Sequence, residues 1–178
     1  MRSKLISSRH ILIIPVLFAL SLGLLLLTWG GTVSRADAVN RAGLVVRFGD
    51  GTVLTRCVEF SEESITGDEL LRRSGLRVVF DYSSGMGAAV CKIEDEGCDY
   101  PAVPCFCQCM GASCVYWAYF HLRGDQWEYS GVGCSNYQVH NGDVEGWSWG
   151  PVTADSGTLP PVIPFADICQ EPPTLSLI

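Results

Sequence analysis

The stretch GLVVRFGDGTVLTRCVEF, residues 43–60, decides the fold because it contains the clearest local structural signal in the chain. Two runs rich in β-branched residues flank Asp50-Gly51, and an Asp-Gly pair between such runs is typical of a tight hairpin turn. We therefore expect strands at 43–48 and 52–60, joined by this turn.

A short helix is expected after the hairpin. Thr66 with Glu69 three residues later has the pattern of a capping box, and Gly75 is a stop signal. Two leucines between these signals provide an apolar face. The pattern predicts one helix over residues 66–74.

The rest of the chain is dominated by strand and turn signals. Residues 97–113 are crowded with Cys, Pro and Gly, show no periodicity, and are interpreted as a disulfide-fixed loop. Strands are expected at 76–82 and 88–93, at 115–122 and 126–130 around an Arg123-Gly124-Asp125 turn, and at 137–140 and 144–149 as a second hairpin around Asn141-Gly142.

This order of elements predicts an α+β domain with a single helix packed across a mostly antiparallel sheet. A β-grasp, ubiquitin-like arrangement fits the order, and we expect this domain to span residues 39–150. The segment 151–178 is rich in proline, which resists helix and ladder pairing. It is expected to be a tail pinned by Cys169.

Residues 1–38 have the pattern of an export signal. Basic residues precede an apolar run from Ile11 to Trp29, and Ala36-Asp37-Ala38 offers the small residues that a signal peptidase accepts. An uncleaved membrane anchor is the alternative, because the apolar run is close to the roughly 20 residues needed to span a bilayer. Both interpretations place residue 39 onward outside the cytoplasm and limit membrane contact to this segment.

The charge balance excludes some classes of partner. The whole chain carries a net charge of −7, and removal of residues 1–38 takes away four basic residues and one acidic residue, which leaves −10. Nucleic acids and anionic membrane surfaces attract basic proteins, so neither is an expected partner.

The nine cysteines are expected to form disulfides, since all of them follow the leader and an oxidising compartment permits the bond. Cysteines at 105, 107 and 109 in an extended segment would lie about 6.6 Å apart, too far for neighbours to share a metal or a relaxed disulfide. The alternatives are a metal site or thiol redox chemistry at Cys105, Cys107, Cys109 and Cys114. One thiol is left over. The disulfide candidates are Cys57, Cys91, Cys98, Cys105, Cys107, Cys109, Cys114, Cys134 and Cys169.

Aromatic residues alternate along the strand at 115–122, so that Trp117, Tyr119 and His121 share one face. One face must be core, and the other can be exposed as a flat platform for a planar ligand. Sheet packing alone is the alternative. The ligand-binding candidates are Trp117, Tyr119, Trp127, Tyr129, Trp147 and Trp149.

Three segments carry a family resemblance: VYWAYFHLRG from Val115, WEYSGVG from Trp127 and VHNGDVEGWSW from Val139. They resemble the C-terminal β-domain of transcobalamin and intrinsic factor, and more closely the bacterial exported domains called transcobalamin-like. The resemblance covers roughly residues 42–150 and implies a β-grasp fold, an extracytoplasmic location and capture of a corrinoid or other ligand. The Cys-rich insertion from Cys91 to Cys114 is foreign to the vertebrate carriers, so no ligand contact is transferred.

Other motifs favour structural interpretations. Gly146-Trp-Ser148-Trp-Gly150 matches a hydrolase elbow but lacks the following helix and a downstream histidine, so a nucleophilic Ser148 is not expected. His121 and His140 could join a metal site with cysteines, and the acids Glu94, Asp95, Glu96 and Asp99 could bind a hard cation; surface or packing roles are the alternatives.

The sequence therefore favours an exported binding module over an enzyme, because it contains no supported set of acid, base and nucleophile. The concrete hypothesis is capture of a corrinoid-like or metal-containing nutrient and its presentation to an uptake transporter. The alternatives are a cell-surface interaction module without a small ligand and a Cys-cluster metal or redox protein.

Overall fold

The computed structural model describes residues 39–110, 113–152 and 157–170. The described residues belong to one compact unit. The export signal or anchor expected at 1–38 lies outside the described residues. Within the described ranges, no helix has the length and apolar character needed to cross a membrane.

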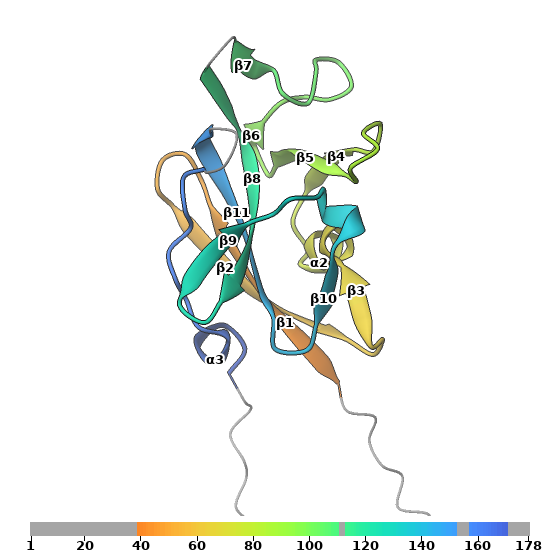
Figure 1. Ribbon diagram of the computed structural model, residues 1–178, viewed down its shortest axis with the longest axis vertical. Coiled ribbons are helices and arrows are strands. Elements are labelled where there is room, and N and C mark those ends of the chain that lie inside the picture. The colour runs from red at the N-terminus through yellow and green to blue at the C-terminus, as the bar shows by residue number, and fades with distance from the viewer. Residues whose placement is uncertain (1–38, 111–112, 153–156, 171–178) are drawn as a thin grey trace, which may run out of the picture. The chain divides into compact units, whose positions relative to one another are not determined.

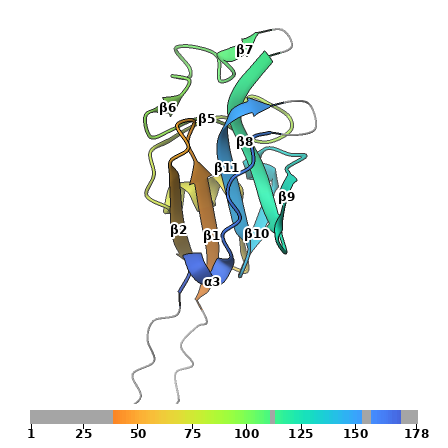
Figure 2. The same ribbon diagram turned by 90° about the vertical axis from the view of Figure 1, so that its left-hand side faces the viewer.

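The domain is rich in sheet and has few helices. Its main sheet has six strands in the order β2-β1-β11-β8-β7, with β9 also paired to β8 (Figures 1 and 2). The strands are β1 (Asn40–Arg47), β2 (Val53–Phe60), β7 (Gln108–Met110), β8 (Ser113–Arg123), β9 (Gln126–Tyr129) and β11 (Val144–Val152).

The hairpin expected at the start of the domain is confirmed. Strands β1 and β2 pair antiparallel from Asn40 opposite Phe60 to Arg47 opposite Val53. At the turn, the Phe48 N–H donates to the carbonyl of Thr52 at 2.8 Å, and Gly51 has φ of 88°. Only glycine adopts that left-handed conformation without strain, which explains the Asp-Gly signal.

The second expected hairpin is wrong. Strand β10 (Gln138–His140) pairs with β3 (Ser64–Thr66), whereas β11 lies in the middle of the main sheet, parallel to β1 and antiparallel to β8. The Asn141-Gly142 turn exists, but it docks on the start of β1. There the Arg41 N–H donates to Asn141 Oδ1, and the Gly142 N–H donates to the Arg41 carbonyl, both at 2.8 Å. These bonds direct the chain into the main sheet rather than back along β10.

The expected helix is present as α2 (Gly67–Arg73), but its capping box is wrong. The Thr66 hydroxyl donates to Asp68 Oδ1 at 2.5 Å, and Glu69 pairs with Arg73. Leu70 and Leu71 are fully buried in the core formed with β1, β8 and β11. The helix is therefore held by its apolar face, as is usual for short helices in proteins.

A small three-stranded sheet lies next to this core. It consists of β4 (Val78–Asp81), β5 (Ala89–Ile93) and β6 (Glu96–Gly97), in that order. The segment expected to be an aperiodic loop at 97–113 contains the end of β6 and all of β7. Both strands are two or three residues long, too short to produce a periodic pattern.

The segment that begins at Gly157 covers the face of the main sheet that carries Ala118 and Phe120, opposite the face covered by α2. A Cβ at Gly157 would lie 3.1 Å from Ala118 and 3.2 Å from Phe120, so this segment packs closely on β8. Strand β11 continues through Pro151, past the boundary expected at residue 150, because Pro151 stands near the end of the strand where a missing donor costs little. The tail also forms α3 (Phe165–Ile168) and is pinned through Cys169, as expected.

Candidate functional site

A cavity of about 630 Å³ opens at the edge of β8, between the residues that pair with β7 and those that pair with β9. Its walls come from the free stretch of β8, the segment 84–90, the segment 129–134 and Phe106. Among the described residues that line it, none is acidic, basic or a histidine. Its volume is in the range typical of sites for small organic ligands.

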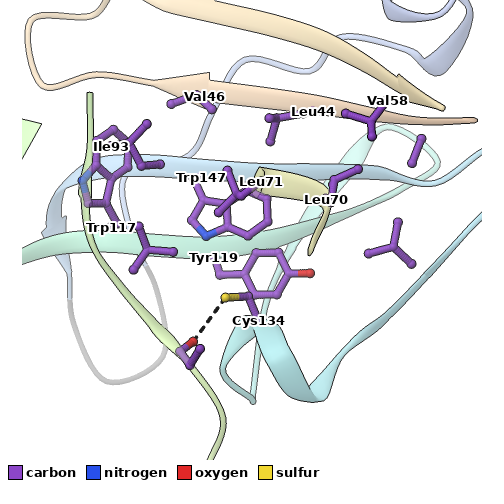
Figure 3. Packing of buried hydrophobic residues seen from close by; sticks show 14 of the residues in the cluster. Leu44, Val46, Val58, Leu70, Leu71, Ile93, Trp117, Tyr119, Cys134 and Trp147 are labelled. Atoms are coloured by element: carbon purple, nitrogen blue, oxygen red, sulfur yellow. Dashed lines mark hydrogen bonds between the residues drawn. The ribbon is translucent and has the colours of Figure 1, made fainter. Parts of the chain in front are cut away.

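The inner wall is aromatic because β8 and β11 pair with their aromatic side chains in register. Trp147 is opposite Tyr119, and Trp149 is opposite Trp117. The rings of Tyr119 and Trp147 stack with centroids 4.3 Å apart, as Figure 3 shows. Such stacked, fully packed rings provide a rigid surface for a flat ligand.

The outer wall carries two phenols. Tyr116 Oη and Tyr129 Oη are 2.6 Å apart and share a hydrogen bond. Phe106 packs edge-on against Tyr116 at 5.2 Å. Its neighbours Cys105 and Cys107 are tied to Cys91 and Cys98, so the disulfides fix the position of this wall.

A free thiol also lines the cavity. Cys134 is 2% exposed, and its Sγ donates to the Ala88 carbonyl at 3.3 Å. Burial, followed by the nearby negative charge of Asp68, raises the pKa of Cys134 to about 12. The thiol is therefore protonated at neutral pH and is not an activated nucleophile.

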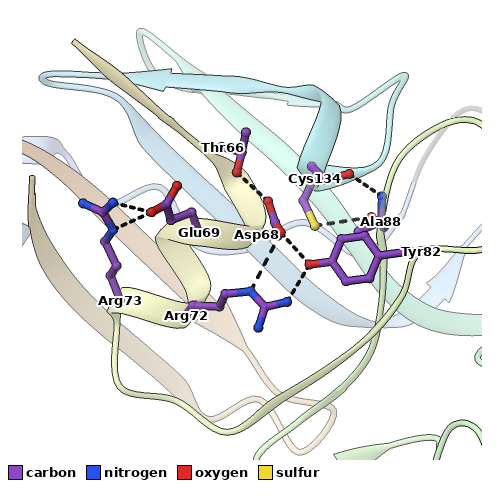
Figure 4. Close-up of polar contacts among 9 residues, drawn as sticks. Thr66, Asp68, Glu69, Arg72, Arg73, Tyr82, Ala88 and Cys134 are labelled. Carbon is purple, nitrogen blue, oxygen red and sulfur yellow. Dashed lines mark hydrogen bonds and ion pairs between the residues drawn. The ribbon is translucent and has the colours of Figure 1, made fainter. Parts of the chain in front are cut away.

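One rim of the cavity is a loop that is anchored from α2. Tyr82, just before the loop, donates to Asp68 Oδ2 at 2.5 Å and accepts a hydrogen bond from Arg72 at 2.7 Å (Figure 4). Further along, the Gly133 N–H donates to the Met86 carbonyl at 2.8 Å. These contacts hold Met86, which is 63% exposed, at the mouth.

A buried polar pair lies behind the inner wall. His121 Nδ1 is 2.6 Å from Glu145 Oε2, and His121 also stacks on Tyr137 with centroids 3.6 Å apart. Burial raises the pKa of Glu145, and the His121 interaction opposes that rise. Among the described residues, Glu145 Oε1 and Tyr119 Oη have no hydrogen-bond partner.

Eight cysteines are joined in four disulfides, and Cys134 is the thiol left over. None of the cysteines at 105, 107 and 109 is bonded to another of the three, which agrees with the distance argument for an extended segment. The metal or redox alternative at Cys105, Cys107, Cys109 and Cys114 conflicts with these bonds, because a disulfide offers no thiolate. The pairs are Cys57–Cys169, Cys91–Cys105, Cys98–Cys107 and Cys109–Cys114.

The six ligand candidates from the sequence do not form one exposed platform. Trp117, Tyr119, Trp147 and Trp149 are at most 7% exposed and belong to the main core, whereas Trp127 and Tyr129 pack with Phe120 on the opposite face. Both faces are covered, one by α2 and the small sheets and the other by the tail. Four of the candidates nevertheless line the cavity: Trp117, Tyr119, Tyr129 and Trp147.

Sequence reasoning missed Phe106, Tyr116 and the two loops of the cavity. Phe106 between two cysteines was a detectable signal, because an apolar residue in a cross-linked loop must pack somewhere. The loop residues Met86 and Val132 had no such signal. Their role depends on which segments the fold brings together.

The remaining motifs have structural roles. Ser148 is fully buried in the middle of β11 and is not on a strand-to-helix turn. Arg123-Gly124-Asp125 is the β8–β9 turn. The loop acids are engaged: Glu94 and Asp95 by Arg77, Glu96 by the Gly49 N–H and Asp99 by Lys92.

No metal site is visible in the part of the chain that is described: no group of three His, Cys, Asp or Glu is placed to hold an ion. His121 and His140 each face an acid, Glu145 and Asp143, rather than a cysteine.

Fold and cavity together define a disulfide-bonded, sheet-rich α+β domain with an uncharged aromatic cavity. Four disulfides are typical of proteins outside the cytoplasm. Residues 110–176 match the model of the SCO2322-like domain. The matched segment is less than half of the chain. No curated protein matches the chain.

The chain is also similar to the crystal structure of a proposed metal-binding protein from Ruminococcus gnavus. The two are 18% identical, and the similarity covers 64% of this chain and 98% of that one, with a TM-score of 0.44.

Proposed function

We propose that this protein is an exported binding module that captures an uncharged, ring-bearing ligand in the cavity beside β8. The observation that carries the proposal is the cavity itself: about 630 Å³, with aromatic walls and no charged lining residue. A charged ligand would lose its hydration there without gaining an ion-pair partner. An uncharged flat molecule would gain burial and stacking.

A corrinoid nutrient is the first named ligand to test, and an uptake transporter is the proposed recipient. A whole corrinoid is larger than the cavity and carries charge, so only an uncharged edge or side arm of it would enter. This part of the proposal is supported by the resemblance to transcobalamin-like domains. Residues of three resembling segments contribute to the cavity, namely Tyr116, Trp117, Tyr119, Tyr129 and Trp147.

We also propose that the fold is a β-grasp. Two features support this. Along the chain, the β1–β2 hairpin is followed by the helix α2. In the main sheet, the last strand, β11, lies at the centre and is parallel to β1. An experimental structure with β1 and β11 antiparallel or separated would contradict this assignment.

Binding rather than catalysis is proposed because the cavity lining contains no carboxylate or imidazole and its thiol is protonated. A turnover activity that disappeared in Cys134→Ala while ligand binding remained would overturn this part.

Tryptophan fluorescence tests the binding proposal, since Trp117 and Trp147 both line the cavity. Cobalamin and cobinamide, with correction for their absorbance, are expected to quench it saturably. Ala89→Phe, which puts a ring into the cavity, is expected to weaken the quenching at least tenfold. Ala102→Phe, in an exposed loop, is the matched control.

The outcomes separate the ligand from the site. Saturable quenching that was equal in Ala89→Phe and the native chain would place binding elsewhere. No quenching by either corrinoid would reject that ligand class, and a panel of neutral aromatic compounds without effect would reject the cavity as a binding site.

A second candidate function is an interaction module, favoured by the apolar rim of the cavity. Met86 and Phe106 are 63% and 44% exposed, and Val132 beside them is 39% exposed. A photo-crosslinking amino acid at position 86 would be expected to capture one defined surface protein, whereas the same group at Asp125 would not. Equal capture at both positions would contradict it.

A further inference from the structure

We infer that the ligand carries an uncharged hydrogen-bond acceptor, best a carbonyl oxygen, which binds to the paired phenols of Tyr116 and Tyr129. This inference rests on the proposed function of the cavity and names the chemistry of its ligand.

The two phenols are held in place by packing on separate elements. Tyr116 comes from β8 and packs edge-on against Phe106, whereas Tyr129 ends β9 and packs edge-on against Phe120 at 5.5 Å. Both residues are partly buried and both line the cavity. Their hydroxyl oxygens are therefore held 2.6 Å apart. They lie on the Phe120 face of the sheet, beside the free edge of β8 at which the cavity opens.

A count of hydrogens leaves one donor free. Each phenol has one O–H and can also accept a hydrogen bond. The shared bond uses one of the two hydrogens, and no group among the described residues accepts the other. The pair thus offers one O–H to a ligand.

Three other polar side chains of the lining are already engaged by backbone. Ser130 Oγ donates to the Val132 carbonyl, Ser84 Oγ donates to the Gly87 carbonyl, and Cys134 Sγ donates to the Ala88 carbonyl. The Tyr119 hydroxyl points toward α2, since a Cβ at Gly67 would lie 2.6 Å from it. Among the hydroxyl and thiol groups of the lining, the phenol pair is therefore the one with a donor left for a ligand.

The acceptor must be uncharged. No cation lines the cavity, so a carboxylate or phosphate would be desolvated without compensation. Burial raises the pKa of Tyr116, so its hydroxyl stays protonated and can act as a donor. Ketones, esters, amides and quinones attached to a ring satisfy these conditions.

Two matched probes test the inference on the full chain. Methyl naphthyl ketone and ethylnaphthalene have nearly the same shape, but a carbonyl in one replaces a methylene in the other. Equilibrium dialysis at low probe concentration measures the bound-to-free ratio of each. The partition coefficients of the two probes between water and hydrocarbon predict a ratio of their binding. We expect the ketone to bind roughly two- to tenfold more than that ratio, because it gains one hydrogen bond.

The decisive variant removes both hydroxyls, because either phenol alone would still donate. Tyr116→Phe with Tyr129→Phe is expected to abolish the ketone preference and to leave ethylnaphthalene binding unchanged. Each single variant should keep the preference. Tyr100→Phe, which removes a phenol outside the cavity lining, is the control and should also keep it.

The outcomes distinguish this inference from the proposed function. The inference would be overturned if both probes bound without a preference for the ketone, or if the preference survived in the double variant. The cavity would still be a binding site in either case. If neither probe bound and Ala89→Phe behaved as the native chain, the cavity proposal would fail as well.

Discussion

Cys134 is the residue at which burial most clearly controls reactivity. Its thiol is 2% exposed and has a pKa of about 12 because burial favours the neutral form. We expect no modification by iodoacetamide at pH 8 in the folded protein and complete modification in urea. Mass spectrometry of the intact chain provides the measurement. Rapid alkylation without denaturant would contradict the buried position.

Glu145 is expected to make stability depend on pH. Burial raises the pKa of its carboxyl above the ordinary value of 4.5, so the folded state binds the proton more tightly than the unfolded state. Stability from this group is full below pH 4.5 and is lost as pH rises through the folded pKa. The free energy of unfolding should therefore fall, relative to Glu145→Gln, as pH rises above 4.5.

Urea denaturation of both proteins at several pH values checks this expectation. The quantity compared is the difference in free energy of unfolding between the native chain and Glu145→Gln. If it stayed constant, or grew in favour of the native chain with rising pH, the interaction with His121 would outweigh the effect of burial on Glu145.

At this scale the sequence could predict faces but not burial. Strict alternation correctly separated Trp117 and Tyr119 from Ala118 and Phe120. The second face is covered as well because of the tail, whose Gly157 packs on Phe120. A proline-rich pattern gives no indication of what such a segment will cover.

Gly67 decides how closely α2 approaches the sheet. A Cβ there would lie 2.6 Å from Tyr119 Oη and 3.0 Å from the Cys134 carbonyl oxygen. Gly67→Ala should therefore lower stability by about 1 to 3 kcal/mol, although alanine favours helices. Tyr119→Phe removes the nearest atom and should restore part of the loss. Thermal unfolding of the two single variants and the double variant measures the coupling, and additive effects would contradict the close contact.

Local elements were predictable, and long-range pairings were not. The hairpin β1–β2 needs only its own turn, and α2 needs only its stop signal and apolar face. The parallel partner of β11 is β1, which is about a hundred residues away in sequence, since Gly43 pairs with Val144. Turn chemistry at Asn141-Gly142 indicated a change of direction but not which strand the chain would join.

The four disulfides should contribute unequally to the whole molecule. Cys57 and Cys169 are 112 residues apart in sequence, whereas Cys109 and Cys114 are 5 apart. Loop-closure entropy predicts that Cys57→Ser with Cys169→Ser costs about 4 to 5 kcal/mol, and that Cys109→Ser with Cys114→Ser costs about 2 kcal/mol. Urea denaturation of the two double variants gives the comparison. An equal loss would mean that native packing, not chain entropy, sets the effect.

The cavity itself could not be predicted from sequence. Composition and cysteine content indicated the compartment, and spacing excluded bonds within the 105–109 cluster, but nine cysteines allow many connectivities. The walls come from residues 84–90 and 129–134, and the Gly133 and Cys134 N–H groups hold them together by donating to the Met86 and Ala88 carbonyls. These bonds involve loop backbone, which leaves no side-chain pattern.

Residues near the two ends of the described range lie side by side. Arg41 Nη1 donates to the Gln170 carbonyl at 3.3 Å, and Cys169 is bonded to β2. A short linker could therefore join the ends, and new termini could be opened at an exposed turn such as Asp125, without moving the sheet. The same proximity suits the domain to insertion as a cassette within a surface loop of an unrelated carrier.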